Sequence, residues 1–222
     1  MLKFLTRILV EIIRFPVMLI WHASGWRLEP SFPDVDKLVI LAVPHTTNMD
    51  FFHFLAMSIH ERRRPYVTFK HTWFWFPMGI LLRLLGGIPI NRDKAMNVVD
   101  KLTDILNSKE RLFLVFTPEG TRSKRKYWKT GFYYTALNAG LPILCGYINY
   151  DKKRAGGGLL LYPTGDIVAD FEKIREFYLE HGQNGKFPER INDLQIKPHH
   201  YKHLVKGTKT DRTQPIPLDS TQ

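Results

Sequence analysis

The chain has 222 residues, of which 44% are hydrophobic, and it carries a formal net charge of +11. This length suits one domain, or one domain with an appendage, and the charge favours an anionic partner such as nucleic acid, a membrane surface or a phosphorylated substrate. The single cysteine, Cys145, excludes an intramolecular disulfide and a cysteine-rich zinc site.

Residues 1–21 are apolar except for Thr6 and a stripe of charged side chains, namely Lys3, Arg7, Glu11 and Arg14. The uncharged stretch at 15–21 is shorter than the ~20 apolar residues that span a bilayer, and no signal-peptide cleavage site follows it. We therefore expect residues 1–28 to form an interfacial helical segment lying on the membrane. An amphipathic helix packed on the protein's own core and a transmembrane span remain open alternatives.

After a loop at 29–36, short apolar segments alternate with segments of helical periodicity. Strands are expected at 37–43, 66–70, 88–90, 112–116, 142–148 and 158–161. Helices are expected at 49–60, 74–85, 93–107, 127–138 and 171–181. This alternation predicts an α/β fold with a mostly parallel central sheet covered by helices. The folded domain is expected to cover 29–203, and 204–222 lacks apolar periodicity and reads as a disordered tail.

Polar clusters directly follow three of the expected strands. They are residues 45–50, Asn91 with Arg92, and residues 117–123. In open α/β sheets, ligands bind outside the carboxyl ends of the strands. We therefore expect the three clusters to converge on one edge of the sheet and to form one site.

The first cluster lies within VPHTTNMDFFHF, residues 43–54, and contains His45 and Asp50. The loop can fold back so that the carboxylate accepts a hydrogen bond from one imidazole nitrogen. The other nitrogen then faces the pocket as a general base, while the carboxylate fixes the tautomer. An ordinary histidine pKa of ~6.5 suits proton abstraction near neutral pH.

Two other interpretations of this cluster stay open from these residues alone. Asp50 could favour a helix N-terminus by its charge, with a side-chain cap from Thr46, Thr47 or Asn48. A metal site would use His45, Asp50 and His53, and the last two share a helix face. No fourth ligand with suitable spacing lies nearby in the sequence.

The third cluster combines a glycine turn with basic side chains. Glu119 and Arg122 flank Gly120, so the backbone can approach a ligand closely. The planar guanidinium of Arg122 suits phosphate, as does that of Arg92 at the other strand end. Further positive charges follow at Lys124, Arg125, Lys126 and Lys129, where a solvated face is the ordinary alternative.

These blocks resemble those of the 1-acyl-sn-glycerol-3-phosphate acyltransferases and related glycerolipid acyltransferases. Residues 45–50, HTTNMD, match the H-x4-D block of that family, and 87–92, GIPINR, resemble the second block. Residues 116–123, FTPEGTRS, match the PEGTR-type block, and WKTG at 128–131 resembles the stretch that follows it. Residues 141–144, LPIL, resemble the fourth block, although Cys-Gly-Tyr departs from its usual ending.

The resemblance implies roles for individual residues. His45 is implied to be the general base that deprotonates an acceptor hydroxyl, and Asp50 the acid that orients it. The positions implied to bind the glycerol-phosphate group are Arg92, Glu119, Gly120, Thr121 and Arg122. Since a carboxylate repels phosphate, Glu119 could instead bind a hydroxyl or hold an arginine in place.

The resemblance also implies the reaction and its partners. A fatty acyl group would move from acyl-ACP or acyl-CoA, as co-substrate, to a lysophospholipid such as 1-acyl-glycerol-3-phosphate, with no cofactor and no metal-ligating residue in the protein. The expected partners are the phospholipid membrane surface, the lysophospholipid, and acyl carrier protein or a CoA thioester, with no nucleic acid. The expected location is peripheral or monotopic on the cytoplasmic face of a membrane.

Two alternatives remain. The acceptor could be a different lipid, such as a lyso-aminolipid. A basic nucleic-acid-binding module would also fit the charge, but the sequence has no recognised binding motif of that kind.

The apolar segment at 71–85 could shape an acyl-chain tunnel, touch lipid through Trp73 and Trp75, or simply fill the core. Arg62, Arg63 and Arg64 could assist membrane docking.

Overall fold

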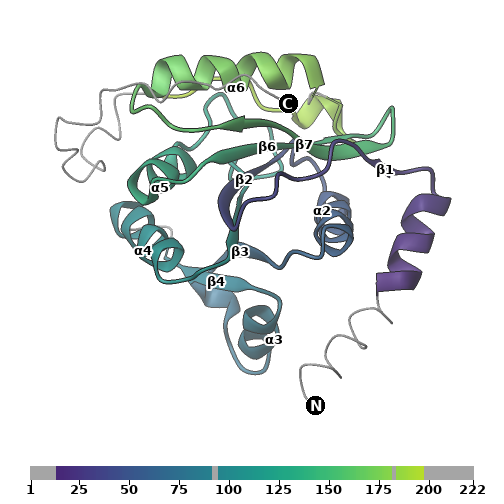
Figure 1. Cartoon of the computed structure of the whole chain (residues 1–222), viewed down its shortest axis with the longest axis horizontal. Coiled ribbons are helices and arrows are strands. Elements are labelled where there is room, and N and C mark those ends of the chain that lie inside the picture. The colour runs from purple at the N-terminus through teal and green to yellow at the C-terminus, as the bar shows by residue number, and fades with distance from the viewer. Residues whose placement is uncertain (1–13, 92–94, 182–183, 198–222) are drawn as a thin grey trace.

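The structure is a computed structural model in which residues 14–91, 95–181 and 184–197 are described (Figure 1). Their strands form one sheet in the order β1-β7-β6-β2-β5-β3-β4. The strands are β1 (Arg27–Leu28), β2 (Lys37–Val43), β3 (Pro65–Lys70), β4 (Gly87–Ile90), β5 (Leu112–Phe116), β6 (Ile143–Asn149) and β7 (Arg154–Leu161). The helices are residues 14–23, α2 (Met49–His60), α3 (Met78–Leu84), α4 (Ala95–Asn107), α5 (Gly131–Ala139) and α6 (Ile167–His181), with 3-10 turns η1 (His71–Trp73) and η2 (Pro188–Arg190).

Most strand pairs of the sheet are parallel. β2 pairs in parallel with β5 and β6, and β3 pairs in parallel with β4 and β5. The exception is the antiparallel pair of β6 and β7, and β1 then runs parallel to β7. The expected α/β fold with a mostly parallel, helix-covered sheet is therefore confirmed.

Helices cover both faces of the sheet (Figure 1). In β2, Val39 and Leu41 pack into a core with α4, α5 and α6, whereas Leu38 and Ile40 pack into a second core with α2 and the helix at 14–23. Successive strand residues point to opposite faces, so a strand covered on both sides must be apolar at every position. This explains why β2 reads as an uninterrupted apolar run.

The helix at 14–23 has two different faces. Met18 and Trp21 are buried in the second core, while Phe15, Leu19 and Ile20 are exposed. The helix thus packs on the protein's own core, as one of the alternatives predicted, and its outer face is apolar and exposed.

In the described ranges, no helix combines the length and apolar character needed to cross a bilayer. Residues 1–13 of the predicted segment at 1–28, and the predicted tail at 204–222, lie outside the described residues.

Three helices begin later or earlier than their predicted bounds. α3 starts at Met78 rather than at 74, since Pro77 has no N–H for a helix interior. α5 starts at Gly131 rather than at 127, because the backbone N–H of Trp128 donates to the carbonyl of Gln195 in an extended contact. α6 starts at Ile167 rather than at 171, where Asp166 accepts the N–H groups of the first turn.

β7 is longer than the predicted strand at 158–161, because its glycines allow close packing. A Cβ on Gly156 would lie 2.6 Å from the carbonyl oxygen of Glu29, and one on Gly158 would lie 2.3 Å from the ring of Phe177. Both positions require glycine so that the chain after β1, and the helix α6, can approach the strand closely. The sequence GGG therefore marks close packing here, not a loop.

Candidate active site

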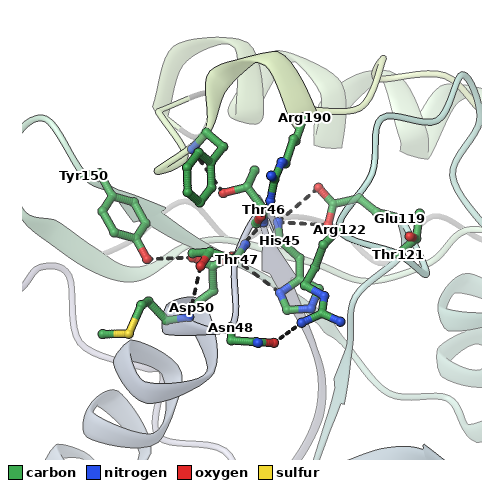
Figure 2. Close-up of polar contacts among 12 residues, drawn as sticks. His45, Thr46, Thr47, Asn48, Asp50, Glu119, Thr121, Arg122, Tyr150 and Arg190 are labelled. Atoms are coloured by element: carbon green, nitrogen blue, oxygen red, sulfur yellow. Dashed lines mark hydrogen bonds and ion pairs between the residues drawn. The ribbon is translucent and has the colours of Figure 1, made fainter.

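The loop that follows β2 is held against the loop that follows β5. The backbone N–H of His45 donates to the carboxyl group of Glu119, with N–O distances of 2.9 and 3.2 Å (Figure 2). β2 and β5 are adjacent and parallel, so their carboxyl ends lie at the same edge of the sheet. The structure therefore brings the first and third polar clusters together, as predicted.

Asp50, at the start of α2, contacts the backbone and the histidine of the first cluster. Its Oδ2 accepts the backbone N–H groups of Thr46 at 2.7 Å and Thr47 at 2.8 Å, and it lies 3.5 Å from Nδ1 of His45. The side chain of Asp50 is 5% exposed and that of His45 is 25% exposed. The loop thus folds back as expected, with a buried carboxylate behind an imidazole that reaches solvent.

The electrostatics of Asp50 suit a permanently ionised carboxylate. Burial alone would raise the pKa of this group. The contacts with His45, with the hydroxyl of Tyr150 and with two backbone N–H groups outweigh burial and hold the pKa below its usual value. A charged Asp50 can fix the Nδ1–H tautomer of His45 and stabilise the imidazolium that forms when Nε2 accepts a proton.

Glu119 has the opposite electrostatics. Its side chain is 4% exposed, and burial raises the pKa of its carboxyl group to about 8, with the nearby charge of Asp50 acting in the same direction. The hydrogen bond from the His45 backbone only partly offsets this effect. At neutral pH the protonated, uncharged form of Glu119 therefore predominates.

The turn after Glu119 brings Arg122 to the first cluster. Gly120 has φ of +68°, a left-handed conformation that favours glycine, and a Cβ there would lie 2.9 Å from Cε of Lys129. The guanidinium of Arg122 donates to the side-chain oxygen of Asn48 (Figure 2). The hydroxyl of Thr121 accepts the backbone N–H of Ser123. Arg122, whose guanidinium is predicted to bind phosphate, thus lies beside the loop that carries His45.

The alternatives for the first cluster can be compared with this geometry. Asn48 occupies the N-cap position of α2 without a side-chain cap, whereas the hydroxyl of Thr47 accepts the N–H of Met49 at 3.3 Å. His53 is buried, and its Nδ1 accepts the indole N–H of Trp21 at 3.1 Å. Among the residues that the structure describes, no group of three or more histidine, cysteine or acidic side chains is arranged to hold a metal ion.

Arg92, which is predicted to bind the acceptor, lies outside the described residues.

Two residues that the sequence did not single out contact the first polar cluster, at 45–50. The hydroxyl of Tyr150 donates to Oδ1 of Asp50 at 2.6 Å, and the guanidinium of Arg190 donates to the carbonyl of Thr46 at 3.3 Å. No local motif marks either residue, although the position of Tyr150 just after β6 signals the edge of the sheet where ligands bind.

Residues 29–149 match the family model described as Acyltransferase. A protein of Escherichia coli (strain K12), named 1-acyl-sn-glycerol-3-phosphate acyltransferase, is 33% identical over 87 residues, which is 36% of each chain. A protein of the same name from Salmonella typhimurium is 30% identical over 107 residues, covering 45% of this chain and 42% of that protein. The chain thus matches less than half the length of these curated relatives.

A solved structure has a similar fold. It is the 1-acyl-sn-glycerophosphate (LPA) acyltransferase PlsC from Thermotoga maritima, with a TM-score of 0.50 and 17% sequence identity. The superposition covers 77% of this chain and 75% of that one. At this identity the likeness concerns the arrangement of strands and helices alone.

Proposed function

Because this chain belongs to the acyltransferase family, we propose that it transfers a fatty acyl group from acyl-ACP or acyl-CoA to the hydroxyl of a lysophospholipid. In its most specific form the acceptor is 1-acyl-glycerol-3-phosphate and the product is phosphatidate. The observation that carries the proposal is the pair of His45 and Asp50, 3.5 Å apart, beside Glu119 and Arg122. The names of the curated relatives support the same acceptor.

In the proposed reaction, Nε2 of His45 removes the proton of the acceptor hydroxyl as its oxygen attacks the thioester carbonyl. The new ester bond forms as the C–S bond breaks, and the proton passes from the imidazolium to the departing thiolate. Asp50 holds Nδ1 and stabilises the transient positive charge. No acyl-enzyme is required, and Cys145 is unsuited to form one, because burial raises the pKa of its thiol to about 12.

Binding of the acceptor phosphate is assigned in the proposal to the loop after β5. Arg122 supplies a charged fork for phosphate oxygens. The raised pKa of Glu119 removes the objection that a carboxylate would repel phosphate, because the neutral acid is uncharged and has an O–H to donate. Glu119 can therefore bind a phosphate or hydroxyl oxygen while it also accepts the N–H of His45.

The acceptor is tested by product analysis. Purified protein is incubated with acyl-ACP or acyl-CoA and a panel of lyso-lipids that includes lysophosphatidate and a lyso-aminolipid, and products are identified by mass spectrometry. We expect thioester-dependent phosphatidate as the main product. Acylation of the lyso-aminolipid alone would support the alternative acceptor, and no acylation of any lipid would contradict the proposed function. The family match gives no support to a nucleic-acid-binding module.

We also propose that the protein binds the membrane peripherally, on the cytoplasmic face, through an exposed apolar surface. This surface, the 73–85 face, is formed by η1, α3, the residues between them and the residue that follows α3, namely Trp73, Trp75, Phe76, Ile80, Leu81, Leu84 and Leu85. Phe76 is 81% exposed. The guanidinium of Arg64 donates to the carbonyls of Arg83 and Leu84, which places cationic groups at its border. Apolar and cationic groups together suit the anionic cytoplasmic leaflet.

Replacement of Phe76 or Trp75 by serine is expected to weaken binding to phosphatidylglycerol-containing vesicles by roughly tenfold each. This follows from the loss of about 1.5 kcal/mol or more for each large apolar side chain that leaves the lipid. Cosedimentation with vesicles measures the effect. Leu179→Ser is the matched control, because Leu179 is a large apolar side chain that is 57% exposed, close to the 60% of Trp75, and lies on α6, far from α3 in Figure 1. Equal binding of all variants would show that another surface contacts lipid.

A further inference from the structure

The carboxylate of Asp50 receives a hydrogen bond from a residue that no motif contains. Oδ1, the oxygen that does not face His45, accepts the hydroxyl of Tyr150 at 2.6 Å (Figure 2). The backbone N–H of Tyr150 in turn donates to the carbonyl of Asn184 at 2.9 Å, just past the end of β6. A short hydrogen bond to a buried charge fixes the orientation of that charge, because rotation would leave both partners unsatisfied.

The ring of Tyr150 is itself held by an aromatic cluster. It meets the rings of Trp26 and His53 edge to face, with centroid distances of 5.2 and 5.3 Å. Trp26 and His53 lie against each other at 3.9 Å, and both are buried. Such contacts leave the tyrosine ring one position, and therefore place its hydroxyl with little freedom.

The cluster reaches the helix at 14–23. The indole N–H of Trp21 donates to Nδ1 of His53 at 3.1 Å, and the rings of Trp21 and Trp26 are stacked 6.2 Å apart. Because an indole nitrogen only donates, Nδ1 of His53 must be unprotonated. Burial lowers the pKa of His53, which is consistent with a neutral ring in this contact. A continuous chain of contacts thus joins the N-terminal helix to Asp50.

We propose that Tyr150 is a positioning residue that orients Asp50 against His45, and that Trp26, His53 and Trp21 hold Tyr150 in place. This inference rests on the proposed function, since it concerns the same catalytic pair. It gives the helix at 14–23 a second role: besides presenting an apolar outer face, it supports the catalytic carboxylate from behind. Residues on that helix then affect turnover without touching substrate.

Tyr150→Phe in the full-length chain tests the first part, because phenylalanine keeps the ring contacts and removes only the hydroxyl. We expect kcat to fall roughly 10-fold, as for the loss of a hydrogen bond to a charged group, with KM for the acceptor unchanged. Tyr147→Phe is the matched control in β6, the strand that ends just before Tyr150, and its hydroxyl donates to the carbonyl of Glu29 and not to Asp50. Its kcat should equal that of the wild type. Equal kcat for Tyr150→Phe and wild type would overturn the proposal.

A nitrogen-15 NMR spectrum of the histidine rings gives a readout that does not need activity. The signals of His45, assigned with His45→Gln, should move in Tyr150→Phe and stay unchanged in Tyr147→Phe, because Asp50 fixes the tautomer of His45. If the wild type transfers no acyl group but the signals move in this way, the proposed function fails and the positioning role stands. Signals that do not move would overturn that role.

Trp21→Phe tests the aromatic support, since it removes the N–H that bonds His53 and keeps most of the packing. We expect a smaller loss of kcat than in Tyr150→Phe. In the double variant, the loss should equal that of Tyr150→Phe alone, because both changes act through the same hydroxyl. Fully additive losses, or no loss in Trp21→Phe, would show that the N-terminal helix does not act through Tyr150.

Discussion

His45→Ala is expected to lower kcat for acyl transfer by about 10²- to 10⁴-fold, the usual contribution of a general base. The side chain of His45 is partly exposed, unlike that of Asp50, so alanine removes the proton acceptor without opening the core. The contact between the loops is also preserved, since Glu119 accepts the backbone N–H of residue 45 and not its ring. The rate of product formation at saturating thioester and acceptor measures the effect.

The control for this variant is His181→Ala, an exposed histidine in the last turn of α6. It should keep the wild-type rate, because the contacts of its ring with the described residues are to α6 and to Tyr147, and none reaches the pair of His45 and Asp50. Equal acyl transfer by His45→Ala and wild type would remove His45 from the mechanism. Loss of activity in both variants would point instead to a general sensitivity of the fold.

The parts of the fold that the sequence predicts well are those set by local pattern. The bounds of β2, α2 and β5 agree with the expectation, because β2 and β5 are short, mainly apolar runs and α2 is a longer segment in which apolar and polar residues alternate with helical periodicity. The edge at which the clusters meet could also be predicted, since it follows from parallel strands alone. The resemblance to an acyltransferase family is confirmed by the match over residues 29–149.

The parts that the sequence could not give depend on contacts between distant segments. Tyr150 reaches Asp50 across 100 positions, and Glu119 reaches the backbone of His45 across 74. No spacing rule links such pairs. The burial of a side chain also depends on distant segments. In the PEGTR block alone Glu119 is an ordinary carboxylate, and its pKa is raised only by burial in the folded protein.

Glu119→Gln is expected to make the protein more stable than the wild type at alkaline pH. The pKa of Glu119 rises from an ordinary value of 4.5 to about 8 in the folded protein, so folding favours the protonated form. The resulting contribution to stability is complete below about pH 4.5 and is lost as the pH rises through 8. Over this window the free energy of unfolding of the wild type should fall by about 1.4 kcal/mol per pH unit from this group alone.

Glutamine is a close match for the neutral acid, because its carbonyl can still accept the N–H of His45 and its amide can donate as the acid does. Glu119→Gln should therefore lack this pH-dependent term, and urea unfolding at pH 6 and pH 9 measures the difference. Glu176→Gln, an exposed site on α6, is the control and should follow the wild type. A parallel pH dependence of Glu119→Gln and wild type would contradict the burial of a neutral acid.

The same ionisation should affect acceptor binding. Above pH 8 a charged Glu119 lies beside the loop of Arg122, where it repels the acceptor phosphate and attracts the guanidinium. KM for lysophosphatidate should therefore rise between pH 7 and pH 9 in the wild type and change less in Glu119→Gln. A neutral acid at this position thus has two effects. It holds the loop of the general base, and it leaves the positive charge of Arg122 available to the phosphate.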